Sequence, residues 1–139
     1  EPGLPRLEHA LATYPKLNFI GHGPGWWASI SGDIKTQKDL GSYPKGPVVE
    51  GGAIDRLMGK YPNIYGDLSA GSGANSISRD KNFGREFMIR RKDRLMFGTD
   101  YLRPGQKVPQ FDVFDGLDLP KEVQASIFKG NATRVLKLS

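Results

Sequence analysis

Apolar residues alternate along the chain between short continuous runs and longer stretches with helical spacing. A continuous apolar run is typical of a buried strand, whereas recurrence every three or four residues is typical of an amphipathic helix. The runs predict strands over residues 17–21, 63–69 and 94–100. The helical spacing predicts helices over residues 4–14, 53–61, 80–92 and 119–129, with Gly130 ending the last of these and Asn131 capping a final short helix through Leu136.

Two further stretches are expected to lie outside the regular elements. Residues 71–76, GSGANS, are rich in small residues and are predicted to form a flexible loop. Residues 23–50 are rich in Gly, Pro, Ser and Lys and read as a long excursion with a helical turn around residues 26–30. Loops of that length within a domain are usually functional.

The alternation of helices and strands predicts an α/β fold with a parallel sheet covered by helices. In such sheets ligands bind beyond the carboxyl ends of the strands, which share one edge. Four polar residues stand at or near the predicted strand ends, namely His22, Asp67, Ser69 and Asp100. We therefore expect three separate segments to meet at one site.

Length and composition narrow the class of protein. The 139 residues are enough for one domain, residues 1–139, and contain no apolar run near the ~18 residues that a membrane span needs. The basic residues behind the net charge of +5 are scattered, so no nucleic acid partner and no membrane association are expected. The absence of cysteine excludes disulfides and thiol nucleophiles, and it fits a reducing compartment such as the cytoplasm.

His22 and Asp100 are the candidate catalytic residues and metal ligands. His22 follows a predicted strand between two glycines, where an imidazole can bind a metal or transfer a proton, although it could instead cap a turn. Asp100 ends the stretch RLMFGTD, where a carboxylate can bind a metal or act as a general base, or simply cap a turn. These two residues alone fall short of a catalytic zinc site, which normally takes three protein ligands.

Other residues allow both a functional and a structural interpretation. Asp67 either reaches the active edge or is satisfied by loop amides. Ser69 does not have glycine at both the second position before it and the second position after it, as a nucleophile elbow requires. Trp26 and Trp27 can wall a substrate pocket or pack against the core, and we expect one of each. His9 stands off the apolar stripe of its helix and is expected to face solvent.

Several separated stretches resemble one known family. They are LATYPKLNFIGHGPGWW, YPNIYGDLSAGSG with the following Arg79 and Asp80, DRLMFGTDYL and IFKGNATRVLKL. Together they resemble the carboxyl-terminal part of the amidohydrolase-related proteins, which are metal-dependent (β/α)8-barrel hydrolases and decarboxylases, including the aminocarboxymuconate semialdehyde decarboxylase type. The resemblance runs from Leu4 to Leu138.

The resemblance implies a part of a TIM barrel, comprising strands six to eight with their flanking helices. His22 matches the strand-six histidine at the metal centre, and Asp100 matches the strand-eight aspartate that binds the metal and acts as general base. Ser69, Trp26 and Trp27 would be substrate-binding residues. The implied cofactor is a divalent metal ion, with zinc expected, and the implied substrate is a small carbonyl or carboxylate compound that is hydrolysed or decarboxylated.

The sequence departs from the family pattern in one respect. It has no counterpart of the family's H-x-H pair on strand one or of its strand-five histidine. A barrel typically needs about 250 residues, so we expect the chain to be the carboxyl-terminal three-eighths of a larger enzyme and to be inactive alone. It would associate with the missing barrel part or form a homo-oligomer. The alternative is a non-catalytic α/β module that self-associates through two open sheet edges.

Overall fold

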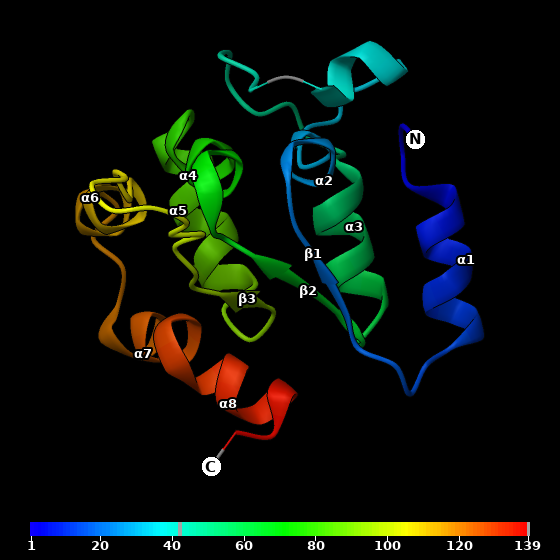
Figure 1. Cartoon of the computed structure of the whole chain (residues 1–139). Helices are drawn as coiled ribbons and strands as arrows, with labels where there is room; N and C mark the ends of the chain where they lie inside the picture. Colours follow the sequence, from blue (N-terminus) through cyan, green and yellow to red (C-terminus); the bar gives the residue numbers. More distant parts are fainter. Residues whose placement is uncertain (42, 139) are drawn as a thin grey trace.

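Three parallel strands form the centre of the protein. The computed structural model describes residues 1–41 and 43–138. The strands β1 (Phe19–Gly21), β2 (Ile64–Asp67) and β3 (Leu95–Met96) lie in the order β1-β2-β3 (Figure 1). Phe19 pairs with Ile64, and Gly66 pairs with Leu95. Each strand lies within its predicted range and is shorter than that range, and the predicted parallel α/β arrangement is confirmed.

Helices connect the strands and flank the sheet. They are α1 (Pro5–Thr13), α2 (Pro24–Ala28), α3 (Ala53–Lys60), α4 (Ala70–Ser78), α5 (Lys81–Arg90), α6 (Gln110–Gly116), α7 (Lys121–Ala125) and α8 (Asn131–Leu136), with a 3-10 turn at Gln37–Gly41 and a π turn at Ser126–Gly130. In Figure 1, α1 and α3 lie to the right of β3, and α6 and α7 lie to its left. No helix in the described part of the chain is long and apolar enough to cross a bilayer.

The core lies between the sheet and these helices. Ile54 and Leu57 of α3, Ile64 of β2 and Phe87 of α5 are fully buried. Leu11 of α1 is buried as well, and these side chains share one apolar cluster. The predicted apolar faces of the helices therefore face the sheet. The prediction that His9 faces solvent agrees with this arrangement, because His9 is exposed. The structure also shows that Asp80 caps α5 by accepting a hydrogen bond from the Phe83 amide.

The predicted flexible loop over residues 71–76 is wrong, because these residues form most of α4. Residues Ser72 to Ala74, Ser76 and Ile77 are buried. A Cβ atom at Gly73 would lie 2.2 Å from the carbonyl oxygen of Leu68, so the absence of a side chain lets the helix approach the end of β2 closely. Tertiary packing overrides the low helix propensity of glycine and serine here.

The carboxyl-terminal helices also differ from the prediction. Gly130 does not end a helix, because the π turn runs directly into α8. Asn131 does not cap that helix; its Nδ2 donates to the carbonyl oxygens of Lys92 and Leu95, the latter at 2.7 Å. The Phe97 amide donates to the carbonyl oxygen of Ile127 at 2.9 Å. These contacts cover the outer side of β3, so the sheet does not have the two open edges that were expected.

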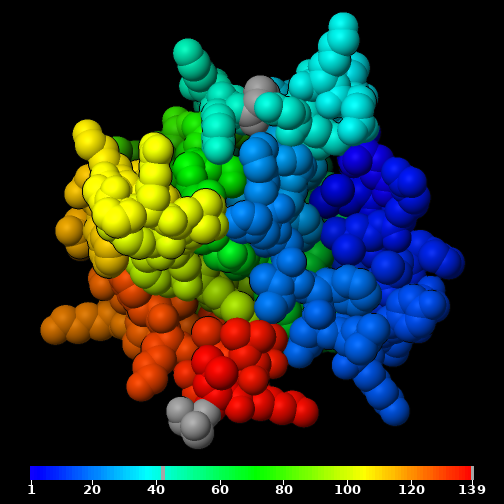
Figure 2. All heavy atoms as spheres, viewed as in Figure 1, coloured from blue at the N-terminus to red at the C-terminus, as the bar shows by residue number. Residues whose placement is uncertain are grey.

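The segments that follow β1 and β3 lie on one face of the molecule. Figure 2 shows the segment after β1, in blue, and the segment after β3, in yellow, on the same face. Both segments continue from carboxyl ends of parallel strands. This face therefore carries the predicted site.

Candidate functional site

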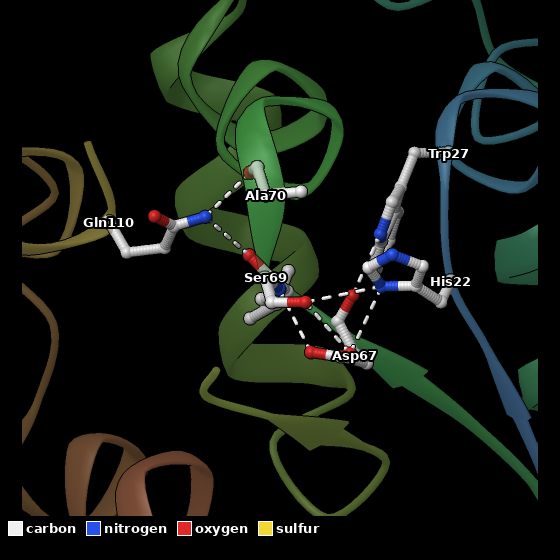
Figure 3. A network of polar contacts seen from close by, with 7 residues as sticks. His22, Trp27, Asp67, Ser69, Ala70 and Gln110 are labelled. Carbon is white, nitrogen blue, oxygen red and sulfur yellow. Dashed lines mark hydrogen bonds and ion pairs between the residues drawn. The ribbon is translucent and has the colours of Figure 1, made fainter. Parts of the chain in front are cut away.

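Three polar side chains meet at the carboxyl ends of β1 and β2 (Figure 3). Nδ1 of His22 lies 3.1 Å from Oδ2 of Asp67 and 3.1 Å from Oγ of Ser69. The Ser69 hydroxyl donates to the same Asp67 oxygen at 2.8 Å, and the Ser69 amide donates to Oδ1 of Asp67 at 2.9 Å. The structure thus brings together three of the four polar residues that stand at the predicted strand ends. Asp67 fulfils both of its alternative interpretations, because it contacts His22 and also accepts from a loop amide.

The hydrogen bonds determine which nitrogen of the His22 ring carries the proton. The Asp67 carboxylate only accepts, and the single Ser69 hydroxyl hydrogen is already donated to it. Nδ1 faces two oxygens that can accept, so the ring places its hydrogen there. In the neutral ring Nε2 then carries a free lone pair. Such a nitrogen can bind a metal ion or accept a proton.

His22 combines this fixed ring with access to solvent. Its side chain keeps 45% of its surface exposed, whereas Asp67 keeps 30% and Ser69 as a residue keeps 4%. Nε2 has no hydrogen-bond partner in the part of the chain that the structure describes. A hollow of about 250 Å³ next to the ring is lined by Leu7, Phe19, Ile20, Gly21, His22, Trp26 and Ile64. Nδ1 is therefore fixed by Asp67 and Ser69, while the His22 side chain stays accessible to solvent and to the hollow.

The geometry does not match a serine nucleophile. In a catalytic triad the serine and the carboxylate contact different nitrogens of the histidine. Here Ser69 and Asp67 both contact Nδ1, and the Ser69 hydroxyl donates to the carboxylate. Ser69 is also buried. Its hydroxyl contacts both Asp67 and His22 and orients them relative to each other, and substrate contact by Ser69 stays a prediction.

The two tryptophans occupy different positions. Trp27 is 2% exposed, and its Nε1 donates to the backbone carbonyl of Asp67 at 2.8 Å. Trp26 is 9% exposed and lines the hollow beside His22, and its own Nε1 is buried with no hydrogen-bond partner among the described residues. Trp27 thus supports the site from the core. Substrate contact by Trp26 stays a prediction.

Asp100 lies on the same strand edge without touching His22. Its backbone has a left-handed conformation with φ of 52°, and its carbonyl oxygen accepts from Nε2 of Gln106 at 2.7 Å. No hydrogen bond or ion pair of its carboxylate occurs within residues 1–41 and 43–138. The segment that carries it does reach the site, because a Cβ atom at Gly98 would lie 2.8 Å from Oδ1 of Asp67. The expected convergence is therefore seen for His22, Asp67 and Ser69 only.

The donor set of this chain does not complete a metal centre. Among the described residues no three His, Cys, Asp or Glu side chains lie close enough together to hold a metal ion. His22 has the orientation of a metal ligand whose second nitrogen is fixed by a carboxylate, but one such ligand is not a site.

Sequence reasoning missed one residue that contributes to the site. Gln110, the first residue of α6, is fully buried, and its Nε2 donates to the carbonyl oxygens of Leu68 at 3.0 Å and Ala70 at 2.6 Å. It therefore holds the backbone on both sides of Ser69 (Figure 3). No local pattern marks this glutamine, which stands in a Pro- and Gly-containing stretch that was not predicted to be helical.

The chain matches a family model over almost its full length. The model is described as amidohydrolase, and it matches residues 3–138. The chain belongs to the amidohydrolase family. The predicted family membership is therefore confirmed. Membership of this family indicates a function of the hydrolase or decarboxylase type. The family has the TIM barrel fold and typically uses divalent metal ions. Comparisons with curated proteins and with solved structures found no match.

Proposed function

We propose that this chain contributes His22 and Asp100 to the active site of a metal-dependent amidohydrolase that acts on a small carbonyl or carboxylate compound. The observation that carries the proposal is the fixed ring of His22, whose Nδ1 lies 3.1 Å from both Asp67 and Ser69. A histidine fixed in this way presents Nε2 in one orientation, which both proton transfer and metal binding require.

The protein's own residues suggest how such a reaction would use them. Nε2 of His22 accepts a proton from a bound water or donates one to the substrate, and the Asp67 carboxylate stabilises the imidazolium that forms. The apolar hollow next to His22 would take the body of a small substrate and exclude water, with Trp26 as one wall. Asp100 is the proposed second protonatable and metal-binding group.

A bound divalent ion, with zinc as our expectation, would polarise a substrate carbonyl and lower the pKa of a water molecule. Because three or more protein ligands are normally needed, we propose that the chain forms the carboxyl-terminal part of a barrel whose other strands supply the rest. A small-molecule substrate and a cytoplasmic location complete the proposal.

The test uses the full-length protein that contains this chain. Hydrolysis of a panel of small amides and lactones, and release of carbon dioxide from small carboxylates, are measured before and after removal of metal with a chelator. We expect activity to disappear with the metal and to return with Zn²⁺. The released product identifies the reaction as hydrolysis or decarboxylation.

Two matched pairs of variants connect the activity to the site. His22→Gln is compared with His9→Gln, an exposed histidine in α1, and Asp100→Asn with Asp118→Asn, another left-handed aspartate. We expect at least about a 100-fold loss of activity for the first member of each pair and no loss for the second. Activity that survives both chelation and Asp100→Asn would refute the proposal and favour a non-catalytic module.

A further inference from the structure

Two residues at the carboxyl edge of the sheet have a backbone conformation that L-amino acids avoid. Ala70 has φ of 60° and Asp100 has φ of 52°. Such residues persist only where the surrounding structure holds them, and they cluster at functional sites. Ala70 directly follows Ser69, which contacts His22, and Asp100 is the other proposed catalytic residue. Both unusual conformations therefore adjoin the proposed chemistry.

A glutamine side chain holds each of these residues. Gln110 donates from Nε2 to the carbonyl oxygens of Leu68 and Ala70. Gln106 donates from Nε2 to the carbonyl oxygen of Asp100 at 2.7 Å and accepts from the Leu102 amide at 2.9 Å. The two glutamines are four residues apart, at and just before the start of α6. One short segment therefore contacts both left-handed turns.

Gln110 is in an environment that an apolar residue would otherwise suit better. It is fully buried, and its Oε1 is buried without a hydrogen-bond partner in the described part of the chain. An unpaired buried oxygen destabilises a protein, and a methionine of similar shape would not carry that cost. What a methionine cannot do is donate to the two carbonyl oxygens beside Ser69. The two donor contacts thus distinguish glutamine from an apolar side chain of the same size.

We propose that Gln110 and Gln106 are positioning residues that set the geometry of the site from outside it. Gln110 fixes the Ser69 turn, and through Ser69 and Asp67 it fixes the ring of His22. Trp27 holds the same turn from the opposite side, at the Asp67 carbonyl (Figure 3). Gln106 fixes the turn of Asp100. The proposal rests on the proposed function, since it assigns these glutamines to the same site.

The test measures the proton position on His22 directly. The protein is labelled with ¹⁵N at histidine, and the ring nitrogen shifts give the fraction of neutral imidazole with hydrogen on Nδ1. His9 is the only other histidine and is an internal reference for an exposed ring. We expect His22 to carry its hydrogen mainly on Nδ1, and we expect Gln110→Met to shift this fraction toward that of His9.

Asn131→Leu is the matched control. Asn131 is also a buried carboxamide that donates to two backbone carbonyls, but these are Lys92 and Leu95, away from the His22 turn. Its loss should lower the unfolding temperature and leave the His22 ring unchanged. If folded Gln110→Met keeps the wild-type His22 proton position, or if Asn131→Leu changes it equally, Gln110 is not a positioning residue.

A second measurement needs only a thermal unfolding transition, so it also applies where Gln110→Met is not stable enough for the ring ¹⁵N measurement. Glycine adopts φ near 60° without strain, whereas an Ala70 that Gln110 no longer holds can leave this conformation, so Ala70→Gly should raise the unfolding temperature less in the Gln110→Met protein than in the wild type. Equal effects in the two backgrounds would show that Gln110 does not hold this turn.

Gln106 is tested by Zn²⁺ affinity in the full-length protein, measured by titration calorimetry. We expect Gln106→Met to weaken binding about tenfold, as loss of a residue that orients a ligand does, while the His22 proton position stays unchanged. Unchanged affinity would remove Gln106 from the proposal. If Gln110→Met shifts the His22 proton but the full-length protein has no metal-dependent activity, the proposed function fails while the positioning by Gln110 stands.

Discussion

Nδ1 of His22 and Oδ2 of Asp67 lie 3.1 Å apart, and the Ser69 hydroxyl donates to the same carboxylate oxygen at 2.8 Å. Because that hydroxyl has no second hydrogen, the His22–Asp67 contact must use the ring's own N–H. The contact therefore orients the ring and also sets its tautomer. In the neutral ring it leaves the lone pair of Nε2 available for proton transfer or metal binding.

Asp67→Asn should reverse this choice. The Ser69 amide still requires an acceptor at the position of Oδ1, so the new NH₂ group faces Nδ1 and forces the ring hydrogen to Nε2. We expect activity of the full-length protein to fall by a factor on the order of 10²–10⁴, comparable with the handicap of a wrong histidine tautomer in triads. Ring ¹⁵N shifts check the tautomer, and kinetics check the activity.

A matched control for that variant is Asp118→Asn, which changes an exposed aspartate whose backbone carbonyl accepts from Arg85. It should alter neither the tautomer nor the rate. An Asp67→Asn protein with the wild-type tautomer would show that the carboxylate does not set the proton position.

Gly98→Ala tests the contact between the segment after β3 and the site. The added Cβ would lie 2.8 Å from Oδ1 of Asp67 and 2.9 Å from Cβ of Ser69, so both residues or the backbone at position 98 must move. Overpacking of this kind typically costs about 1–3 kcal/mol of the free energy of unfolding. We expect that loss in urea denaturation, together with a change in the His22 ring shifts.

Gly46→Ala provides the comparison, because an added Cβ at Gly46 would meet no atom within 4 Å. Its unfolding free energy and His22 shifts should match those of the wild type. Equal behaviour of the two alanine variants would mean that Gly98 can accept a side chain and that the close approach is not structurally required.

The sequence pattern was sufficient to locate the site but not to describe its geometry. His22, Asp67 and Ser69 were found because each stands at the end of an apolar run, and parallel strands bring such ends together. The pattern does not say which ring nitrogen is bound, because that depends on atoms placed by contacts 45 and 47 residues apart in the chain.

The same limit explains the residues that the pattern missed. Gln110 contacts carbonyl groups 40 and 42 residues away, and Asn131 contacts carbonyl groups 36 and 39 residues away. Local spacing predicts a helix cap for Asn131 and nothing for Gln110. Helix α4 was missed because its small residues are poor helix formers that only close packing makes suitable, as Gly73 shows against Leu68.

The two tryptophans should respond differently to substitution by phenylalanine. Trp27→Phe removes a 2.8 Å hydrogen bond to the Asp67 carbonyl, whereas Trp26→Phe removes an N–H that is buried without a partner within residues 1–41 and 43–138. Both variants lose volume, so the difference isolates the hydrogen bond. We expect Trp27→Phe to lower the free energy of unfolding by about 1 kcal/mol more than Trp26→Phe does. Equal losses in urea denaturation would contradict a supporting role for Trp27.

Glu8 makes the stability of the protein sensitive to acid. Hydrogen bonds from Lys60 and Arg56, each at 2.8 Å, lower the pKa of the Glu8 carboxyl from 4.5 to about 2. A carboxyl whose pKa is lower in the folded state stabilises the fold fully above its unfolded value, and this contribution is lost as the pH falls from 4.5 to about 2. Glu8→Gln should therefore have a lower unfolding temperature than the wild type near neutral pH, and this difference should disappear as the pH falls through this range.

Glu86→Gln, at an exposed position in α5 without an ion pair among the described residues, should show no such pH-dependent difference. A Glu8→Gln deficit that stays constant down to pH 2 would mean that the ion pairs do not contribute to stability.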